Sequence, residues 1–289
     1  MSEQKQQEVA TQQPKTVIGL LSNEMVKKRF ADIMGKNSAS FISSIISATK
    51  SNPELLNCDP DSVISSAVIA ATLNLPIQSN LGFAHIVPYN TKTGKFAQFQ
   101  MGWKGYVQLA LRTGQYKTIN TSEIYEGELI KHDRISGDVE IDTNKKKSDR
   151  VVGYVAYFKF INGFEKSLYW TKEQVEKHGG KYSKSYKSEY GRWKLDFDSM
   201  AIKTVIKQLL SKYGILSVEM QTAITTDQAI IKNADTLDVE YIDANEEEKP
   251  VSNAMNVKEG LEIEIKSSDK QLKMDEASKN NPTLNFDKQ

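Results

Sequence analysis

The stretch VVGYVAYFKFINGFEKSLYW, residues 151–170, predicts two antiparallel strands joined by a tight turn. Both arms are rich in the β-branched and aromatic side chains that favour strands. Between them lies Asn162-Gly163, a dipeptide typical of short hairpin turns. A second turn-rich connection separates residues 83–89 from residues 96–101, and residues 117–142 predict two or three further short strands. The middle of the chain is therefore expected to contain antiparallel β-structure.

Helical patterns lie on both sides of this β-structure. In the N-terminal third, apolar side chains recur every three or four positions and predict helices at about residues 23–34, 38–50 and 60–73. Residues 102–112 predict a helix between the strands, and residues 195–213 predict a long amphipathic helix. The N-terminal third is thus expected to be a helical subdomain.

Charge divides the chain into three regions. The 289 residues include 38 Lys and Arg and 37 Asp and Glu, so the formal net charge is only +1. Residues 1–91 have a net charge of 0, residues 92–213 of +9 and residues 214–289 of −8. A basic middle indicates a polyanionic partner, and an acidic end indicates a regulatory or partner-binding tail. We therefore expect a disordered N-terminal segment at residues 1–22, an ordered core at residues 23–220 and a disordered acidic linker and tail at residues 221–289.

The sequence lacks the signatures of several protein classes. No run approaches the roughly 18 apolar residues of a membrane helix, and the Gln- and Glu-rich N-terminus has no apolar segment of a secretory signal. The one cysteine, Cys58, excludes an intramolecular disulfide, and the three histidines argue against a Cys/His zinc site. Neither a glycine-rich phosphate loop nor a dinucleotide fingerprint is present. We expect a soluble protein of a reducing compartment. The sequence requires no cofactor, and Mg²⁺ is possible but not required.

A metal-dependent nuclease is an alternative, because aspartates lie in close pairs. Asp59 and Asp61 lie at one predicted helix start, and Asp196 and Asp198 lie at another. Carboxylate pairs hold the metal ions of nucleases, but an aspartate at a helix start also caps the backbone and stabilises the helix dipole. Capping is the favoured interpretation, and a nuclease that uses Asp196 and Asp198 stays open.

The segment KHGGKYSKSYKSEYGRWK, residues 177–194, carries the most informative functional pattern. Its cations suit phosphates, and its flat rings can stack on bases of any sequence. The alternative is a solvated surface loop whose tyrosines lie on the protein. We expect Trp103 and Trp193 in the core and leave open whether Tyr182 and Tyr186 stack on bases. The residues of this segment predicted to bind nucleic acid are Lys181, Tyr182, Lys184, Tyr186, Lys187, Arg192 and Lys194.

Two further basic elements strengthen this prediction. Lys203 and Lys207 are four residues apart, so they share one face of the predicted helix. Lys104 and Arg112 are expected to be exposed on the helix at residues 102–112, and Lys117 follows it. Together with the segment at residues 177–194, these side chains are predicted to line a single basic groove.

Three blocks of sequence carry a resemblance to a known family. The first is NPELLNCDPDSV at residues 52–63, which continues to LGFAHIVPY at residues 81–89. The second is GWKGYVQLALRTG at residues 102–114, and the third is RWKLDFDSMAIKTVIK at residues 192–207. With these blocks in this order, the sequence closely resembles the RecT group of phage and prophage recombinases, the single-strand annealing proteins, over roughly residues 30–220.

The resemblance implies an α+β fold, in which a small antiparallel sheet is flanked by helices. It also implies that the core binds single-stranded DNA, forms homo-oligomeric rings or filaments and pairs complementary strands into annealed duplex without ATP. The implied protein is not an enzyme and acts in the cytoplasm of a bacterial host cell. The implied partners are a phage exonuclease and the single-strand-binding protein of the bacterial host. The acidic tail, with Leu284 and Phe286, is the candidate contact for that host protein. A coat protein that binds single strands without annealing them is a second alternative.

The resemblance also assigns residues by motif. Lys203 and Lys207 fall on the family's basic helix, and Lys104 and Arg112 on the helix of the second block. This sequence has Arg192-Trp193 where many relatives have Pro-Trp, and Lys207 where arginine is common. Glutamate in place of both Lys203 and Lys207 is expected to abolish DNA binding while the protein stays folded.

Overall fold

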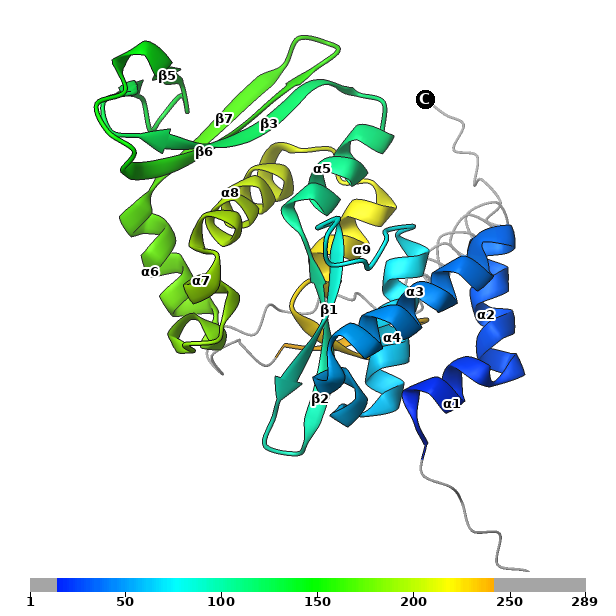
Figure 1. Ribbon diagram of the computed structural model, residues 1–289. Coiled ribbons are helices and arrows are strands. Elements are labelled where there is room, and N and C mark those ends of the chain that lie inside the picture. The colour runs from blue at the N-terminus through cyan, green and yellow to red at the C-terminus, as the bar shows by residue number, and fades with distance from the viewer. Residues whose placement is uncertain (1–14, 242–289) are drawn as a thin grey trace, which may run out of the picture. The chain divides into compact units, whose positions relative to one another are not determined.

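The computed structural model describes residues 15–241, which form an α+β fold of antiparallel sheets and helices (Figure 1). The predicted fold class is therefore confirmed. Residues 1–14 and 242–289 lie outside the described residues, and so do the predicted tail residues Leu284 and Phe286. No helix within residues 15–241 is long and apolar enough to cross a membrane.

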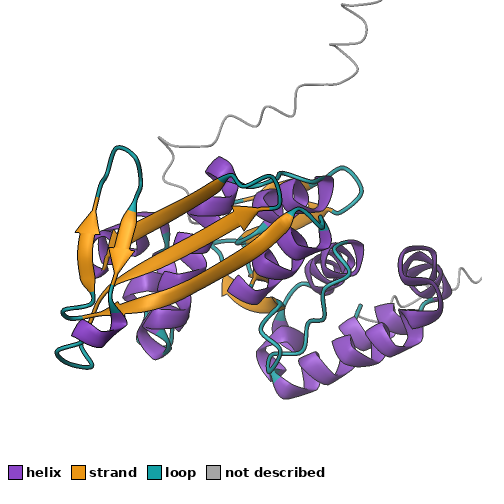
Figure 2. Cartoon of the chain, turned by 90° about the horizontal axis from the view of Figure 1, so that it is seen from above, coloured by secondary structure: helices purple, strands orange, loops and turns teal. Residues whose placement is uncertain are grey.

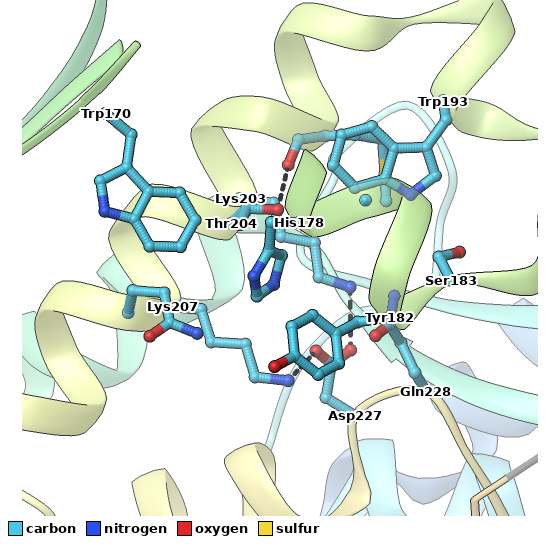
Figure 3. A pocket seen from close by; sticks show the side chains of 13 residues that line it. Trp170, His178, Tyr182, Ser183, Trp193, Lys203, Thr204, Lys207, Asp227 and Gln228 are labelled. Atoms are coloured by element: carbon cyan, nitrogen blue, oxygen red, sulfur yellow. Dashed lines mark hydrogen bonds and ion pairs between the residues drawn. The ribbon is translucent and has the colours of Figure 1, made fainter. Parts of the chain in front are cut away.

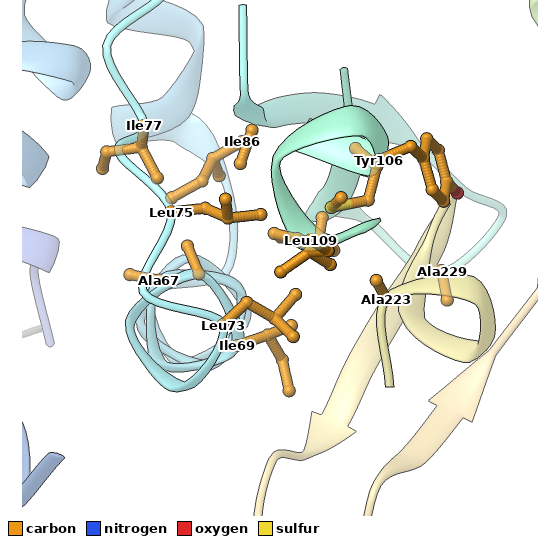
Figure 4. Close-up of a cluster of buried hydrophobic side chains, with 14 of the residues drawn as sticks. Ala67, Ile69, Leu73, Leu75, Ile77, Ile86, Tyr106, Leu109, Ala223 and Ala229 are labelled. Atoms are coloured by element: carbon orange, nitrogen blue, oxygen red, sulfur yellow. The ribbon is translucent and has the colours of Figure 1, made fainter. Parts of the chain in front are cut away.

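The N-terminal subdomain is helical, as the sequence predicts. α4 begins at a predicted start, because the Asp59 carboxylate accepts a hydrogen bond from the Ser62 N–H at 2.8 Å and Pro60 occupies the first turn. α4 packs against α1, α2 and the strands β1 (Ala84–Asn90), β2 (Lys95–Met101) and β8 (Ala229–Asn233). Figure 4 shows Leu73, directly after α4, facing Leu109 of α5 (Trp103–Arg112), with Ala223 of α9 (Val218–Thr226) in the same cluster. The helices of the subdomain are α1 (Val17–Ser22), α2 (Glu24–Met34), α3 (Ser38–Ser51) and α4 (Pro60–Thr72), with short 3-10 helices at Gly35–Asn37 and Pro53–Asn57.

The ordered chain begins earlier than predicted. Residues 17–22 belong to the segment expected to be disordered, yet they form α1. The Thr16 side chain accepts a hydrogen bond from the Gly19 N–H at 3.0 Å, and Val17 and Leu21 are only 1% and 2% exposed. So short a helix is marginal by itself, and packing of these two side chains into the core stabilises it. The sequence does not predict this helix, because six residues are too few to show a periodic pattern and the stabilising contacts are with distant parts of the chain.

A four-stranded antiparallel sheet joins distant parts of the chain. β1 and β2 form the predicted hairpin, whereas β8, β9 and most of α9 fall in the predicted linker. The ordered chain therefore continues past the expected boundary at residue 220. Ala229, Ile230 and Ile231 are buried and hold β8 in place, and an apolar run of three residues is too short to predict a strand. The strand order is β1 (Ala84–Asn90), β2 (Lys95–Met101), β8 (Ala229–Asn233) and β9 (Asp238–Glu240).

A second antiparallel sheet has the order β3 (Tyr116–Tyr125), β6 (Val151–Phe160) and β7 (Glu165–Thr171). Its hairpin turns where Asn162-Gly163 predicts. Gly163 has a φ of 92°, and the Asn162 side chain accepts a hydrogen bond from the Phe164 N–H at 3.0 Å. β4 (Leu129–His132) and β5 (Val139–Ile141) form a separate hairpin, followed by a 3-10 helix at Thr143–Lys145.

α8 (Phe197–Tyr213) contacts all three strands of the second sheet and also packs against α5, so it links the two sheets. Figure 2 shows helices gathered along one side of the three long strands. α6 (Lys172–Tyr182) starts at a capping box of Thr171 and Gln174. A 3-10 helix at Lys184–Lys187 and the short α7 (Arg192–Leu195) then lead into α8.

Candidate nucleic-acid interface

A buried carboxylate organises the region between α8 and the first sheet. Asp227 follows α9 directly, and its side chain is 0% exposed. Its Oδ1 accepts hydrogen bonds from the Met101 N–H at 2.9 Å and from Lys203 Nζ at 2.9 Å. Its Oδ2 accepts from Tyr106 Oη at 2.9 Å and from Lys207 Nζ at 2.7 Å. Four donors from β2, α5 and α8 therefore converge on one carboxylate (Figure 3 draws its two lysine contacts).

The charges of this cluster do not cancel. Burial raises the pKa of Asp227, but the ammonium groups of Lys203 and Lys207 outweigh burial and hold that pKa well below its ordinary value. Burial lowers the pKa of Lys203, and the attraction of Asp227 opposes that effect. Two lysines share one ionised carboxylate, so the cluster retains a net positive charge.

A cavity of about 390 Å³ lies above this cluster. One wall is a row of rings, in which the centroids of Trp170 and His178 are 5.1 Å apart and those of His178 and Tyr182 are 4.6 Å apart. Tyr182 is 44% exposed and stands at the outer end of the row. Lys203, Lys207 and Asp227 also line the cavity (Figure 3). The remaining lining residues are Gly179, Ser183, Trp193, Met200, Thr204, Gln208 and Gln228.

Two histidines have lowered pKa values because they are buried and because cations lie near them. Burial and the nearby charges of Lys207, Lys181 and Lys212 lower the pKa of His178 to about 4. Burial and the charges of Lys203 and Arg192 likewise lower the pKa of His85, on β1, to about 4. Both imidazoles are therefore neutral at pH 7, and the cationic character of the site comes from lysine and arginine.

The structure brings together only some of the predicted site residues. Tyr182, Lys203 and Lys207 line the cavity. Lys203 and Lys207 share a face of α8, as predicted, but that face is directed inward: the Lys203 side chain is 8% exposed and the Lys207 side chain 25%. Glutamate at both positions would place three carboxylates around a buried site. The expectation that such a variant stays folded is therefore corrected.

Arg112 has a structural contact that the sequence does not reveal. Its guanidinium donates to the Leu73 carbonyl at 2.6 Å and to the Asn74 carbonyl at 2.7 Å, just where α4 ends. These carbonyls have no partner within the helix, and an arginine near them also favours the helix dipole. Lys104 and Lys117 are exposed, and none of these three residues lines the cavity. That all the basic elements line one groove therefore stays a prediction. The cavity itself is lined from β7, α6, α7 and α8 and by Ser183, Asp227 and Gln228.

The basic segment at residues 177–194 divides into packed and exposed side chains. Trp193 is 5% exposed, which confirms it as a core residue, and its ring centroid lies 5.4 Å from that of Tyr186. Tyr186 also covers Gly179, where even a Cβ would approach its ring to 2.7 Å. Tyr186 therefore packs within the protein, whereas Tyr182 faces the cavity. The exposed cations of this segment are Lys177, Lys181, Lys184, Lys187, Arg192 and Lys194.

The aspartate pairs of the nuclease alternative have other roles. Asp196 caps α8 by accepting a hydrogen bond from the Ser199 N–H at 3.3 Å, and Asp198 accepts one from Tyr154 Oη at 2.5 Å. Among residues 15–241, no group of three or more His, Cys, Asp or Glu side chains is placed to hold a metal ion. The favoured interpretation of these aspartates as capping residues is confirmed for Asp59 and Asp196.

Asp227 is the residue that sequence reasoning missed. It lies in the stretch expected to be an acidic linker, and its partners are 20 to 126 positions away in the chain. One acidic residue among many carries no signal of burial, so only the folded chain reveals it.

Comparison with known proteins agrees with the geometry. The RecT family model matches residues 39–249, a span that contains every residue lining the cavity. The chain is 50% identical to protein YqaK of Bacillus subtilis (strain 168) over 277 residues, which cover 92% of this chain and 95% of YqaK. It is 30% identical to Protein RecT of Escherichia coli (strain K12) over 181 residues, which cover 61% of this chain and 66% of that protein.

Proposed function

Because the chain belongs to the RecT family, we propose that it pairs complementary DNA single strands without hydrolysing a nucleotide, within a homo-oligomer. Membership makes it a DNA-binding recombination protein of the single-strand annealing type. The proposal adds that the activity is ATP-independent, that the protein aligns strands and does not cut them, and that no cofactor takes part.

One observation supports the location of the DNA: a single cavity is lined both by Lys203 and Lys207 and by the rings of Trp170 and Tyr182. Cations favour the phosphates of a strand, and aromatic rings favour the faces of its bases. The exposed cations of residues 177–194 belong to the segment that also supplies His178, Tyr182 and Trp193 to the cavity lining. Lys187, Arg192 and Lys194 are proposed to contact phosphates there, together with Lys181 and Lys184.

Annealing follows from this arrangement by simple electrostatics. Two complementary strands repel each other through their phosphates, and a cationic surface that neutralises both strands lowers that repulsion. Adjacent protomers would repeat the surface and keep a long strand extended. Base pairing then supplies the sequence specificity, and the protein supplies only alignment.

The proposed partners follow from the same family. A phage exonuclease would generate the single strands, and the single-strand-binding protein of the bacterial host would deliver them. Leu284 and Phe286, which lie outside the described residues, are proposed to contact that host protein through the acidic end of the chain.

The test is the annealing of two complementary labelled oligonucleotides, followed by fluorescence quenching without any nucleotide and across a salt series. We expect acceleration without loss of strands, and a log–log salt dependence of strand binding of about −0.7 per phosphate bound. Binding without acceleration would favour the coat protein, and magnesium-dependent loss of strands would favour the nuclease. No binding at low salt would refute the proposal.

A further inference from the structure

We propose that the cavity above Asp227 holds one unstacked base of the bound strand in each protomer, while Lys207 contacts the phosphate of the same nucleotide. This inference rests on the proposed function, and it goes further by assigning a ligand to one cavity. The ligand is a nucleotide within a DNA strand, not a base pair and not a phosphate alone.

The wall of rings is the first argument. Trp170, His178 and Tyr182 come from β7 and α6 and stand in one row, with successive centroids 5.1 and 4.6 Å apart. A side chain that served only the core would be covered, but Tyr182 is 44% exposed at the mouth of the cavity. Lys181 Nζ lies 4.8 Å from the centroid of this ring, so a cation for a phosphate is next to it. A partly exposed flat ring can stack on a base of any sequence.

The charge pattern is the second argument, because it distinguishes a site for a nucleotide from a site for phosphate alone. Lys203 and Lys207 share Asp227, so the two ammonium groups together supply about one net charge. Lys203 is almost fully buried, and only Lys207, at 25% side-chain exposure, is partly accessible from the cavity. A polyphosphate site would present several uncompensated cations. Among the residues that line the cavity, one partly accessible ammonium lies beside a row of rings, a combination that fits one phosphate and one base.

The volume of the cavity and its polar lining side chains are the third argument. Its volume of about 390 Å³ lies within the range of sites that enclose small molecules, roughly 300–1,000 Å³. Gln208, Gln228 and Thr204 line it beside the rings and provide amide and hydroxyl groups. Such groups can both donate and accept, so they satisfy the polar edge of any base. Capture of one base by each protomer would interrupt the stack of the bound strand at regular intervals.

The experiment compares two oligonucleotides of equal length, one of thymidine residues and one whose sugars carry no base. The ratio of their affinities isolates the contribution of bases from that of phosphates. The wild-type protein is expected to prefer the thymidine strand. Tyr182→Ala is expected to lower that ratio by about tenfold, a change typical of removing one base stack, and to leave binding of the abasic strand unchanged.

Two variants control the result. Tyr182→Phe retains the ring and should keep the wild-type ratio. Tyr190→Ala removes a tyrosine that is 91% exposed in the same segment but does not line the cavity, so it should also keep the ratio.

Each contrary outcome has a separate meaning. If Tyr182→Ala kept the wild-type ratio of affinities, the base pocket would be refuted. The proposed function would stand, because the protein would still bind strands. Equal losses on both strands would also overturn the pocket, since the ring would then matter only to folding or charge. Competition by free thymidine monophosphate at the same nucleotide concentration would reassign the cavity to a mononucleotide. Failure of the wild-type protein to bind either strand would refute the proposed function itself.

Discussion

Two groups of basic side chains lie close together in the sequence but differ in their surroundings. Lys203 and Lys207 on α8 are held by the buried carboxylate of Asp227, whereas the cations of residues 184–194 are exposed to solvent. A buried lysine without a counter-charge would cost several kcal/mol, so the first group depends on its partner for folding. An exposed lysine is well solvated and contributes little to stability. The same residue type therefore stabilises the fold in the first group and is exposed to a ligand in the second, while the partly exposed Lys207 is proposed to do both.

The largest effect is expected from Asp227→Ala. The substitution leaves two ammonium groups, the Tyr106 hydroxyl and the Met101 N–H without their acceptor. Loss of one partner of a buried ion pair costs about 3–5 kcal/mol, so the free energy of unfolding should fall by that amount. Denaturant unfolding followed by circular dichroism measures it.

Asp235→Ala is the matched control. Asp235 pairs with Arg29 at 2.6 Å, but its side chain is 75% exposed, so its loss should cost less than about 1 kcal/mol. Equal losses in the free energy of unfolding of the two variants would show that the buried ion pairs of Asp227 stabilise the fold no more than an exposed pair does.

The two lysines of the cluster are expected to differ in their effects on stability and on strand binding. Lys203→Met should lower the free energy of unfolding by about 1–3 kcal/mol, because a fully buried donor to Asp227 is removed. Lys207→Met should cost less, because that side chain is partly exposed, yet it should weaken strand binding more. Unfolding curves and strand affinities of both variants test this. A Lys207→Met protein that binds DNA like the wild type would remove Lys207 from the interface.

Acid should destabilise the protein through its two shielded histidines. The folded pKa values of His85 and His178 are about 4, against about 6.5 when unfolded. Because the folded state favours the neutral imidazole, this stabilisation is fully present above pH 6.5 and is lost progressively as the pH falls toward 4. For His85 the loss is at most about 3 kcal/mol. It should be smaller for His178, which is more exposed.

His85→Gln tests this by difference. Gln is uncharged at every pH, so the free energy of unfolding of the variant should fall less than that of the wild type between pH 6.5 and 4. Parallel pH profiles would mean that burial and the nearby cations do not hold His85 neutral in the folded protein.

The sequence predicts the elements of this protein better than their contacts. Asn162-Gly163 locates a hairpin and Asp59-Pro60 locates a helix start, because a turn and a cap are formed by neighbouring residues. Helical spacing also places Lys203 and Lys207 on one face. It does not tell whether that face meets solvent or a carboxylate, since the deciding residue lies about 20 positions further along.

The two ends of the ordered region are hard to predict from sequence for the same reason. α1 and β8 are short, and each is stable only because its few apolar side chains reach a core built by other elements. Arg112 could be predicted as exposed, but its contacts with the end of α4 depend on how two helices pack. Local pattern therefore predicts which residues are basic, and tertiary packing decides which of them a strand can reach.

The smallest effect on stability is expected from Lys184→Gln combined with Lys187→Gln. Both side chains are exposed, so the free energy of unfolding should change by no more than about 0.5 kcal/mol. The salt dependence of strand binding should nevertheless become shallower by about 0.7 in the log–log slope for each phosphate that the variant no longer binds. Lys50→Gln, on α3 and exposed but outside the predicted interface, provides the control and should leave the slope unchanged. If Lys50→Gln changed the slope as much per lysine, DNA binding would depend on total charge and not on the segment beside the cavity. A shallower slope in the double variant alone, at constant stability, would separate the cations that bind DNA from those that hold the fold.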